Sequence, residues 1–169
     1  PIYTYRPNHD WAIYSGLRID RFKKFDGQHV TYDQANSRYD TVNHETGTYT
    51  ELSPKLAIEH YVTDSLNVYA SYGHSFNPPP LSQVYRYSDI VKANPNLDPE
   101  RSDSFEIGLK KEWNTKTTLN VSGFYVKTKD KVKYLTYYDN SGNVDYKMYN
   151  NVDEESRRGV ELEVRHQLS

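Results

Sequence analysis

The stretch LNVYASYGHSF, residues 66–76, decides the fold class of this chain. Successive side chains of a β-strand point to opposite faces of the sheet, so a strand between two different environments alternates in sequence. One face of this stretch receives mainly apolar residues, namely Leu66, Val68, Ala70, Tyr72 and Phe76. The other face receives Asn67, Tyr69, Ser71, Gly73 and Ser75. The pattern predicts a strand that separates an apolar from a polar environment.

The same alternation recurs along the chain and predicts six full strands after a short first piece at 2–6. They fall near residues 11–20, 48–62, 65–76, 103–113, 117–128 and 160–168. Pro54 lies inside one of them and cannot donate to a sheet ladder, so we expect a bulge or weakened pairing there. We interpret 25–47 and 77–102 as polar loops, and 129–156 as a hairpin that extends its flanking strands around the turn at 140–143.

The connections alternate between short and long. Short turns are predicted at 7–10, 63–64 and 114–116, and the long connections lie between them. This is the order of an up-and-down meander with all short turns at one end, which in outer-membrane barrels is the periplasmic end. Trp11 directly follows one short turn and Trp113 directly precedes another, so both are predicted to lie in an interfacial aromatic girdle on the lipid face.

Composition narrows the possible classes. The chain has 169 residues, 36% of them hydrophobic, and a mean hydropathy of −0.93, with no run of the roughly 20 apolar residues that a spanning helix needs. Low hydropathy is compatible with a membrane barrel, because only alternate strand residues meet lipid. The 17 tyrosines suit strands and interfaces, while the lack of cysteine excludes disulfides and thiolate metal sites. A net charge of −2 gives no electrostatic case for nucleic acid.

The sequence therefore predicts an all-β chain, part of an antiparallel up-and-down transmembrane β-barrel. A soluble antiparallel sandwich is the alternative, but soluble hairpins do not usually place all long loops on one side. Six strands are fewer than the about 8 of the smallest membrane barrels, and an open edge in lipid is not tolerated. We expect residues 1–169 to form part of one larger barrel domain, without the signal peptide that export requires and without a plug domain.

Three sequence boxes resemble the β-barrel of a TonB-dependent outer-membrane receptor. The first contains Phe76, Asn77, Pro78 and Pro79, at the end of the strand pair that includes 52–56 and 66–72. The second contains Asn94, Pro95, Asn96 and Leu97, before the strand that includes 104–110. The third begins with Arg158 and Gly159. We interpret these box residues as architectural, since proline fixes φ and ends a ladder.

The resemblance implies a plugged barrel of the 22-stranded type in the outer membrane of a Gram-negative bacterium. It implies import of a scarce nutrient, most simply a ferric siderophore, energised through TonB. Its partners would be outer-membrane lipid, an iron chelate or another small-molecule substrate, the remaining strands and plug of the same receptor, and TonB, contacted through an N-terminal segment that this chain lacks. From the residues themselves we expect no enzyme activity, no resident cofactor or metal, and no nucleic-acid partner.

Candidate substrate contacts are aromatic and basic side chains in the long connections, where stacking and cation–π contacts would hold an iron chelate. They are Tyr85, Arg86 and Tyr87 in the proline-rich loop, and Tyr134, Tyr137, Tyr138, Tyr146 and Tyr149 in the last hairpin. Cross-strand aromatic pairing that stabilises an exposed ribbon is the alternative role for the hairpin tyrosines.

A haem receptor of the same family is an alternative reading. Haem receptors typically carry an axial histidine between the first two boxes, and here there is none; Tyr85 or Tyr87 could ligate iron instead. His74 precedes the loop and is predicted to face outward. A passive porin and an adhesin-type barrel remain as rivals from other classes. No histidine cluster has metal-ligand spacing, and no nucleophile lies beside a base, so catalytic residues are not predicted.

Overall fold

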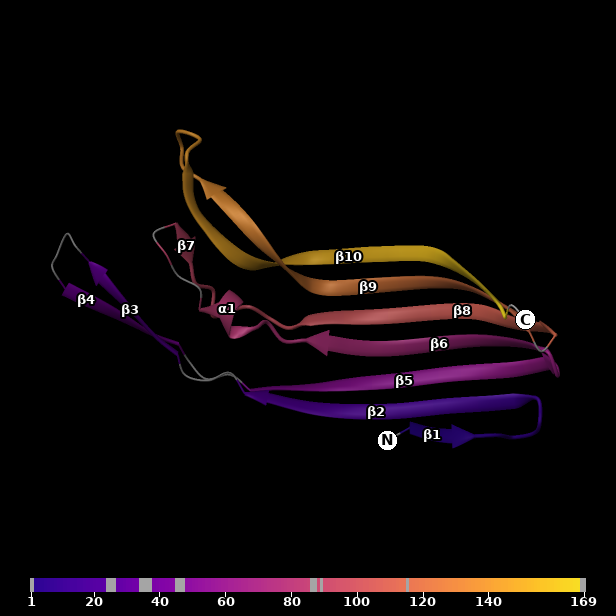
Figure 1. Ribbon diagram of the computed structural model, residues 1–169. Helices are drawn as coiled ribbons and strands as arrows, with labels where there is room; N and C mark the ends of the chain where they lie inside the picture. Colours follow the sequence, from indigo (N-terminus) through magenta and orange to yellow (C-terminus); the bar gives the residue numbers. More distant parts are fainter. Residues whose placement is uncertain are drawn as a thin grey trace.

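The chain folds as one open β-sheet, with a small second sheet beyond the end of β2 and β5 (Figure 1). The computed structural model describes residues 2–23, 27–33, 38–44, 48–85, 88, 90–114 and 116–167. These residues form ten strands and one helix of four residues, α1 (Leu81–Val84). No helix in this described part is long and apolar enough to cross a membrane. The all-β prediction is confirmed.

The six predicted strands and the short first piece are all present. They are β1 (Ile2–Tyr5), β2 (Trp11–Lys23), β5 (Thr48–Thr63), β6 (Leu66–Asn77), β8 (Glu100–Asn114), β9 (Thr117–Tyr138) and β10 (Val144–His166). Each pairs antiparallel with the next along the chain, in the sheet order β1-β2-β5-β6-β8-β9-β10. The up-and-down order predicted from sequence is therefore correct. The hairpin of β9 and β10 extends the ladder without a break in topology, as expected.

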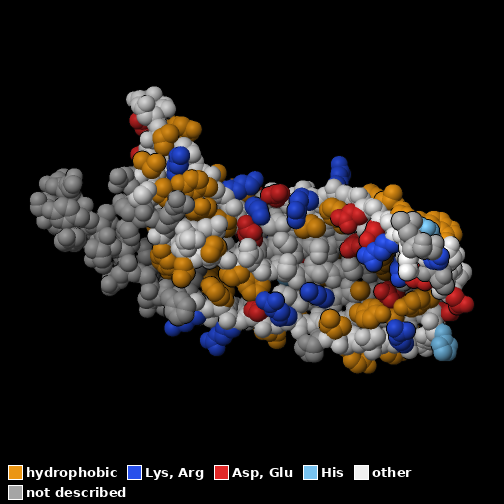
Figure 2. All heavy atoms as spheres, in the orientation of Figure 1, with side chains coloured by type: hydrophobic (Ala, Val, Ile, Leu, Met, Phe, Trp, Pro, Cys, Tyr) orange, Lys and Arg blue, Asp and Glu red, His pale blue; other side chains and the backbone are white. Residues whose placement is uncertain are grey.

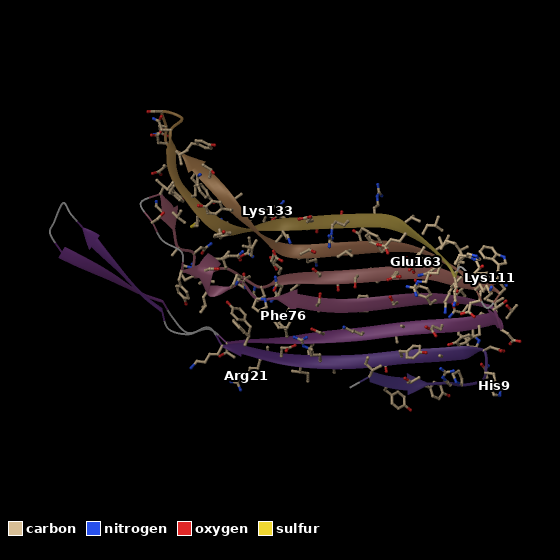
Figure 3. All side chains as sticks on the ribbon, in the orientation of Figure 1. His9, Arg21, Phe76, Lys111, Lys133 and Glu163 are labelled. Atoms are coloured by element: carbon tan, nitrogen blue, oxygen red, sulfur yellow. The ribbon has the colours of Figure 1, made fainter. Side chains whose placement is uncertain are left out.

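The connections after β1, β5 and β8 lie at one end of the sheet, and the long segments after β2 and β6 lie at the other, together with the tip of the extended β9–β10 hairpin (Figure 1). We call these the short-turn end and the long-loop end. One short turn occupies 64–65, a single residue later than predicted. In Figure 3, Arg21 and Phe76 lie near the long-loop end, whereas His9 and Lys111 lie near the short-turn end. The sheet thus has a polarity, with the connections after β1, β5 and β8 sharing one end.

The segment 25–47 is more regular than predicted. It contains β3 (Gly27–Asp33) and β4 (Arg38–His44), which pair antiparallel over their whole length in a separate two-stranded sheet. The loop prediction rested on the two glycines and on the several Asn and Asp residues of this segment. The runs 30–32 and 39–42 also contain Val, Thr and Tyr. These residues favour strands, and their preference outweighs the turn-forming residues around them.

The predicted loop 77–102 also contains structure. Helix α1 is followed by β7 (Val91–Lys92), which pairs parallel with β10. Strand β8 begins at Glu100, before the predicted start at 103. Short elements of two to four residues leave no periodic signal in a sequence, so the alternation could not reveal them.

Pro54 does not cause a bulge. Strands β2 and β5 pair in unbroken register through Leu17 and Pro54. On the other side of β5, the ladder with β6 ends at the pair Lys55 and Gly73. The expected bulge is wrong, whereas the weakened pairing is present on one side only. The missing N–H of proline is tolerated where a ladder ends.

The two faces of the sheet differ in chemistry, and we call them the apolar face and the polar face. Apolar-face side chains are largely uncovered, with Ile107 exposed by 68%, Leu162 by 69% and Val160 by 78%. Among the described residues no second layer packs over this face, and the buried apolar residues are Ala12, Val84, Val91 and Leu97, with Pro79 and Pro99. A soluble sandwich would bury such a face, so the exposed apolar face favours a lipid-facing surface over the sandwich alternative.

Candidate functional site

A small packed core lies at the long-loop end, where the proline-rich segment 78–99 meets β10. Strand β7 aligns Val91 with Lys147, and the Lys147 amide donates to the carbonyl oxygen of Ile90 at 2.7 Å. The side chains of Leu97 and Pro99 are fully buried, and those of Val84 and Val91 nearly so. The long loop is therefore fixed onto the last hairpin.

The Asn-Pro-Asn-Leu box makes the contacts that fix it. The Asn94 side-chain amide donates to the Tyr149 carbonyl oxygen at 2.9 Å, and its oxygen accepts from the Asn96 amide at 3.1 Å. The Asn151 side chain completes the clamp, since it donates to the Asp98 carbonyl oxygen at 3.1 Å and accepts from the Asp98 amide at 2.9 Å. With Leu97 buried beneath, these contacts give the box an architectural geometry.

The first box borders an apolar cavity of about 300 Å³ at the same end. Phe76 and Asn77 close the ladder between β6 and β8, and the three prolines 78–80 then leave the sheet. The cavity is lined by Phe22, Lys23, Tyr49, Pro78, Pro79, Pro80, Leu81, Val84, Tyr85 and Pro99. Strand ends and loop thus form one concave surface rich in rings.

The hairpin tyrosines form two cross-strand pairs. The rings of Tyr134 and Tyr149 have centroids 4.8 Å apart, and those of Tyr137 and Tyr146 are stacked at 4.6 Å with an interplanar angle of 14°. Lys92 adds a third layer, with its Nζ 3.5 Å from the centroid of the Tyr146 ring. A cation–π contact therefore continues the stack from β9 across β10 to β7.

The predicted substrate residues separate into groups. Tyr85 lines the cavity, whereas none of the five hairpin tyrosines does. Four hairpin tyrosines pair with one another, and Tyr138 is exposed by 64%. Arg86 and Tyr87 lie outside the described residues. The structure thus gives two aromatic surfaces at the long-loop end, one concave and one stacked.

Several residues of these surfaces were not identified from the sequence, among them Phe22, Tyr49 and Lys92. Phe22 and Tyr49 face each other across β2 and β5, at polar-face positions near the ends of their strands. The sequence does contain a signal for both residues, because each is aromatic at a position where the alternation predicts a polar residue. Lys92 gave none, because its partner Tyr146 lies 54 residues further along the chain.

An ionic cluster ties three strands together below the loop. The Arg101 guanidinium pairs with Glu51 of β5 and, at 3.2 Å, with Asp130 of β9. Asp130 adopts a left-handed φ of 55°, which aspartate tolerates better than most residues. Because the ladder between β5 and β6 stops at Lys55, Arg101 supplies the connection that the missing backbone hydrogen bonds do not.

The hairpin tip is fixed by Asp139. Its carboxylate accepts hydrogen bonds from the backbone amides of Asn143 at 2.9 Å and Ser141 at 2.8 Å. The bond from Asn143 is the main reason that the pKa of Asp139 lies below its ordinary value, since hydrogen bonding favours the charged carboxylate. Gly142 completes the turn with a φ of 83°.

The charges on the polar face pair largely with one another. Ion pairs join Lys110 to Glu112 at 2.9 Å and Arg165 to Glu163 at 2.8 Å. The Tyr69 hydroxyl donates to Glu106 at 2.8 Å. The described residues contain no group of three or more His, Asp or Glu side chains able to hold a metal ion.

Aromatic rows border the apolar face at both ends. Trp11 stacks on His60 with centroids 4.2 Å apart, and Trp113 is exposed by 60%, both at the short-turn end. Toward the long-loop end, Tyr72, Phe105 and Tyr125 align across three strands. This second row was not identified from the sequence, because Tyr and Phe also occur throughout the strands.

A family model described as "TonB dependent receptor-like, beta-barrel" matches residues 3–169. The chain belongs to the TonB-dependent receptor family. Members of this family are outer-membrane proteins of Gram-negative bacteria, and the similar proteins of known structure are transporters and receptors rather than enzymes. The family expected from the three boxes is confirmed.

Solved receptors share the fold over nearly the whole chain. A double mutant of the Serratia marcescens hemophore receptor HasR, in complex with HasA and heme, matches at a TM-score of 0.76 and 21% identity over 98% of this chain. The copper transporter OprC matches at 0.76 and 20% over 98%, and the ferric yersiniabactin uptake receptor FyuA from Yersinia pestis at 0.68 and 21% over 98%. This chain spans 30%, 26% and 23% of those chains, respectively.

Proposed function

We propose that this chain is part of an outer-membrane receptor that imports a ferric siderophore with energy delivered through TonB. The observation that supports it is the pair of aromatic surfaces at the long-loop end, the cavity of about 300 Å³ and the stack of Lys92 on Tyr146. In the proposed orientation this end is extracellular, where a receptor first meets its substrate.

The chemistry of the two surfaces fits an iron chelate. Exposed tyrosine rings and the rings of the cavity offer flat apolar contacts to a chelator, and the Lys92 ammonium favours a chelate with negative charge. Figure 2 shows hydrophobic side chains, which include tyrosine, gathered at the long-loop end and again toward the short-turn end, with charged side chains between and among them. The group at the long-loop end would make the first contact with the substrate.

The remaining partners follow from the family. We propose that outer-membrane lipid covers the apolar face, and that further strands of the same receptor extend the open sheet into a closed barrel. A plug domain inside that barrel and an N-terminal segment that contacts TonB would complete the transporter. We call the whole protein that contains this chain the full-length receptor.

Two other substrates have structural neighbours. The HasR structure contains heme, but no histidine occurs between residues 78 and 99 of this chain, and Tyr85 would have to leave its cavity position to ligate iron. OprC is a copper transporter, and the described part of this chain has no cluster of metal-ligating side chains. Ferric siderophore uptake therefore remains the favoured proposal over haem, copper, passive porin and adhesin functions.

Uptake assays test the proposal directly. A strain that lacks the receptor, complemented with wild type, would be given radiolabelled ferric siderophores of several classes, haemin and Cu²⁺ separately. We expect one ferric siderophore to enter, and its uptake to disappear when TonB is also deleted. Uptake of haemin or copper alone would refute the siderophore assignment, and uptake independent of TonB would favour a porin.

The stack supplies a site-directed version of this test. Tyr146→Ala removes the ring between Lys92 and Tyr137, and we expect weaker siderophore binding by the full-length receptor. Tyr125→Ala removes an equally large ring from the apolar face and serves as the matched control. Equal binding by both variants and wild type would exclude the stack from the substrate site.

A further inference from the structure

The hairpin of β9 and β10 continues past the end of β8, and there one edge of β9 has no partner strand (Figure 1). The ladder between β8 and β9 ends at the pair Arg101 and Lys129, whereas β9 runs on to Tyr138. Among the described residues, β10 is the only strand that pairs with 132–138. We call residues 132–138, on the side of β9 away from β10, the free edge.

The backbone groups of the free edge point outward at every second residue. The Val132 amide donates to the Glu100 side chain of β8 at 2.8 Å, so the backbone of Val132 faces away from β10. Backbone direction alternates along a strand, and the register of 131–137 with β10 is unbroken. The N–H and C=O groups of Tyr134 and Thr136 therefore also face the free edge.

Closure of the barrel does not cover the free edge. Strands β8 and β10 already flank β9 in the sheet, so additional wall strands must join at β1 or at β10. The chain between β7 and β8 docks on the other side of the hairpin, where the Asn94 side chain donates to the Tyr149 carbonyl oxygen at 2.9 Å. The free edge therefore stays accessible above a closed wall.

The free edge lacks most of the features that keep strand edges unpaired. No proline occurs between residues 130 and 139, and no register shift interrupts 131–137. Its valine, threonine and tyrosine residues favour extended backbone. A flat edge of this kind is a template for a strand from another chain.

Lysines beside the free edge define the charge of the strand that it would accept. Lys131 pairs with Glu100 at 3.5 Å. Lys133, labelled in Figure 3, is exposed and makes no ion pair within the part of the chain that the structure describes. Opposite charges attract across neighbouring strands and like charges repel, so an incoming strand gains from an acidic residue opposite Lys133. Leu135 and Tyr137 lie on the same face and favour apolar neighbours.

We propose that the free edge binds an extended, acidic segment of an extracellular protein by β-strand addition. The segment would exchange main-chain hydrogen bonds with Tyr134 and Thr136 and place a carboxylate at Lys133. This interaction recognises a polypeptide, not an iron chelate, so it goes beyond substrate uptake. It requires only that the long-loop end lies outside the cell.

Peptide binding to the full-length receptor in detergent, measured by fluorescence anisotropy, tests the proposal. The probe is a dye-labelled, end-capped heptapeptide, Thr-Val-Thr-Val-Thr-Glu-Thr, and the control peptide has Lys in place of Glu. We expect the Glu peptide to bind roughly tenfold more tightly to wild type, because it replaces a like-charge neighbour of Lys133 with an opposite charge. Lys133→Glu should reverse the order of the two peptides.

N-methylation of the Glu peptide tests the main-chain hydrogen bonds without any receptor variant. One derivative carries N-methyl groups on its two central threonines and the other on its two valines. Only one of these alternating sets can face the receptor. We therefore expect one derivative to bind roughly tenfold more weakly than the unmethylated peptide and the other to bind equally well.

Thr136→Pro removes one N–H from the free edge and should weaken binding about fivefold, whereas Thr136→Ala keeps that N–H and should leave binding unchanged. In wild type without peptide, amide exchange should be fast at Thr136 and slow at Leu135, whose N–H faces β10. Slow exchange at both would show that another segment of the receptor covers the edge. That result would overturn the proposal, as would equal affinity for the Glu and Lys peptides, equal loss with both methylation patterns, or receptor dimers that Thr136→Pro dissociates.

Discussion

Gly108 lies directly opposite Tyr69 in the ladder of β6 and β8, and the tyrosine ring covers it. A Cβ at Gly108 would come within 2.5 Å of the Tyr69 Cζ, a distance that real Cβ atoms do not adopt. Gly108→Ala must therefore displace the ring and with it the 2.8 Å hydrogen bond from the Tyr69 hydroxyl to Glu106.

The expected cost has two parts. Overpacking of this kind costs about 1–3 kcal/mol, and the lost hydrogen bond about 1 kcal/mol. Removal of a strand glycine returns about 0.5–1 kcal/mol. We therefore expect Gly108→Ala to lower the free energy of unfolding by about 2 kcal/mol.

The assay is guanidinium unfolding of the full-length receptor in detergent. Gly123→Ala is the matched control, because its added Cβ would meet nothing closer than 3.9 Å. In a Tyr69→Ala background the ring is absent, and Gly108→Ala should then cost less than about 0.5 kcal/mol. An equal cost of Gly108→Ala with and without the Tyr69 ring would refute the reasoning, and so would a cost no larger than that of Gly123→Ala.

Three further predictions concern Gly159 of the third box, Leu97 of the long loop and Asp139 of the hairpin tip. Gly159→Ala should lower the free energy of unfolding by about 1–3 kcal/mol, because its Cβ would lie 2.7 Å from the Phe124 ring, and Phe124→Ala should abolish that cost. Leu97→Ala, at a fully buried position, should cost about 2–5 kcal/mol and expose the long loop to proteolysis, whereas Leu81→Ala, exposed by 59%, should do neither. The pKa of Asp139 is lowered in the folded hairpin, so its stabilisation is present above the unfolded pKa of about 3.9 and is lost as pH falls through the folded value. Amide exchange of the hairpin turn, corrected for intrinsic rates, should therefore rise at acid pH in wild type and lose this pH dependence in Asp139→Asn.

Gly159 of the third box shows what could be predicted from the sequence and what could not. Arg158 and Gly159 resembled a family signature, and the resemblance alone gave no physical reason for the glycine. In the structure Gly159 pairs with Phe124 across β9 and β10, and the ring occupies the space where a side chain would be. Register, which fixes this pairing, depends on the tertiary fold.

The candidate site was predictable in composition but not in arrangement. Tyr137 and Tyr146 were recognised as a tyrosine-rich hairpin, because they flank a clear turn signal. Their stacking at 4.6 Å follows from a register shift between Val144 and Tyr146, which no local pattern reports. Lys92 joined the stack only because β7 docks on β10.

The sequence by itself determined the seven strands of the meander, their two faces and the turns that share one end of the sheet. These are local properties, since a period of two residues and a turn signal are set by neighbours in the chain. The tertiary structure decided which distant residues meet. Arg101 reaches Glu51 across 50 positions, and Phe22 and Tyr49 close a cavity against Pro78. Such contacts depend on the order and register of strands, which place residues together that the sequence keeps apart.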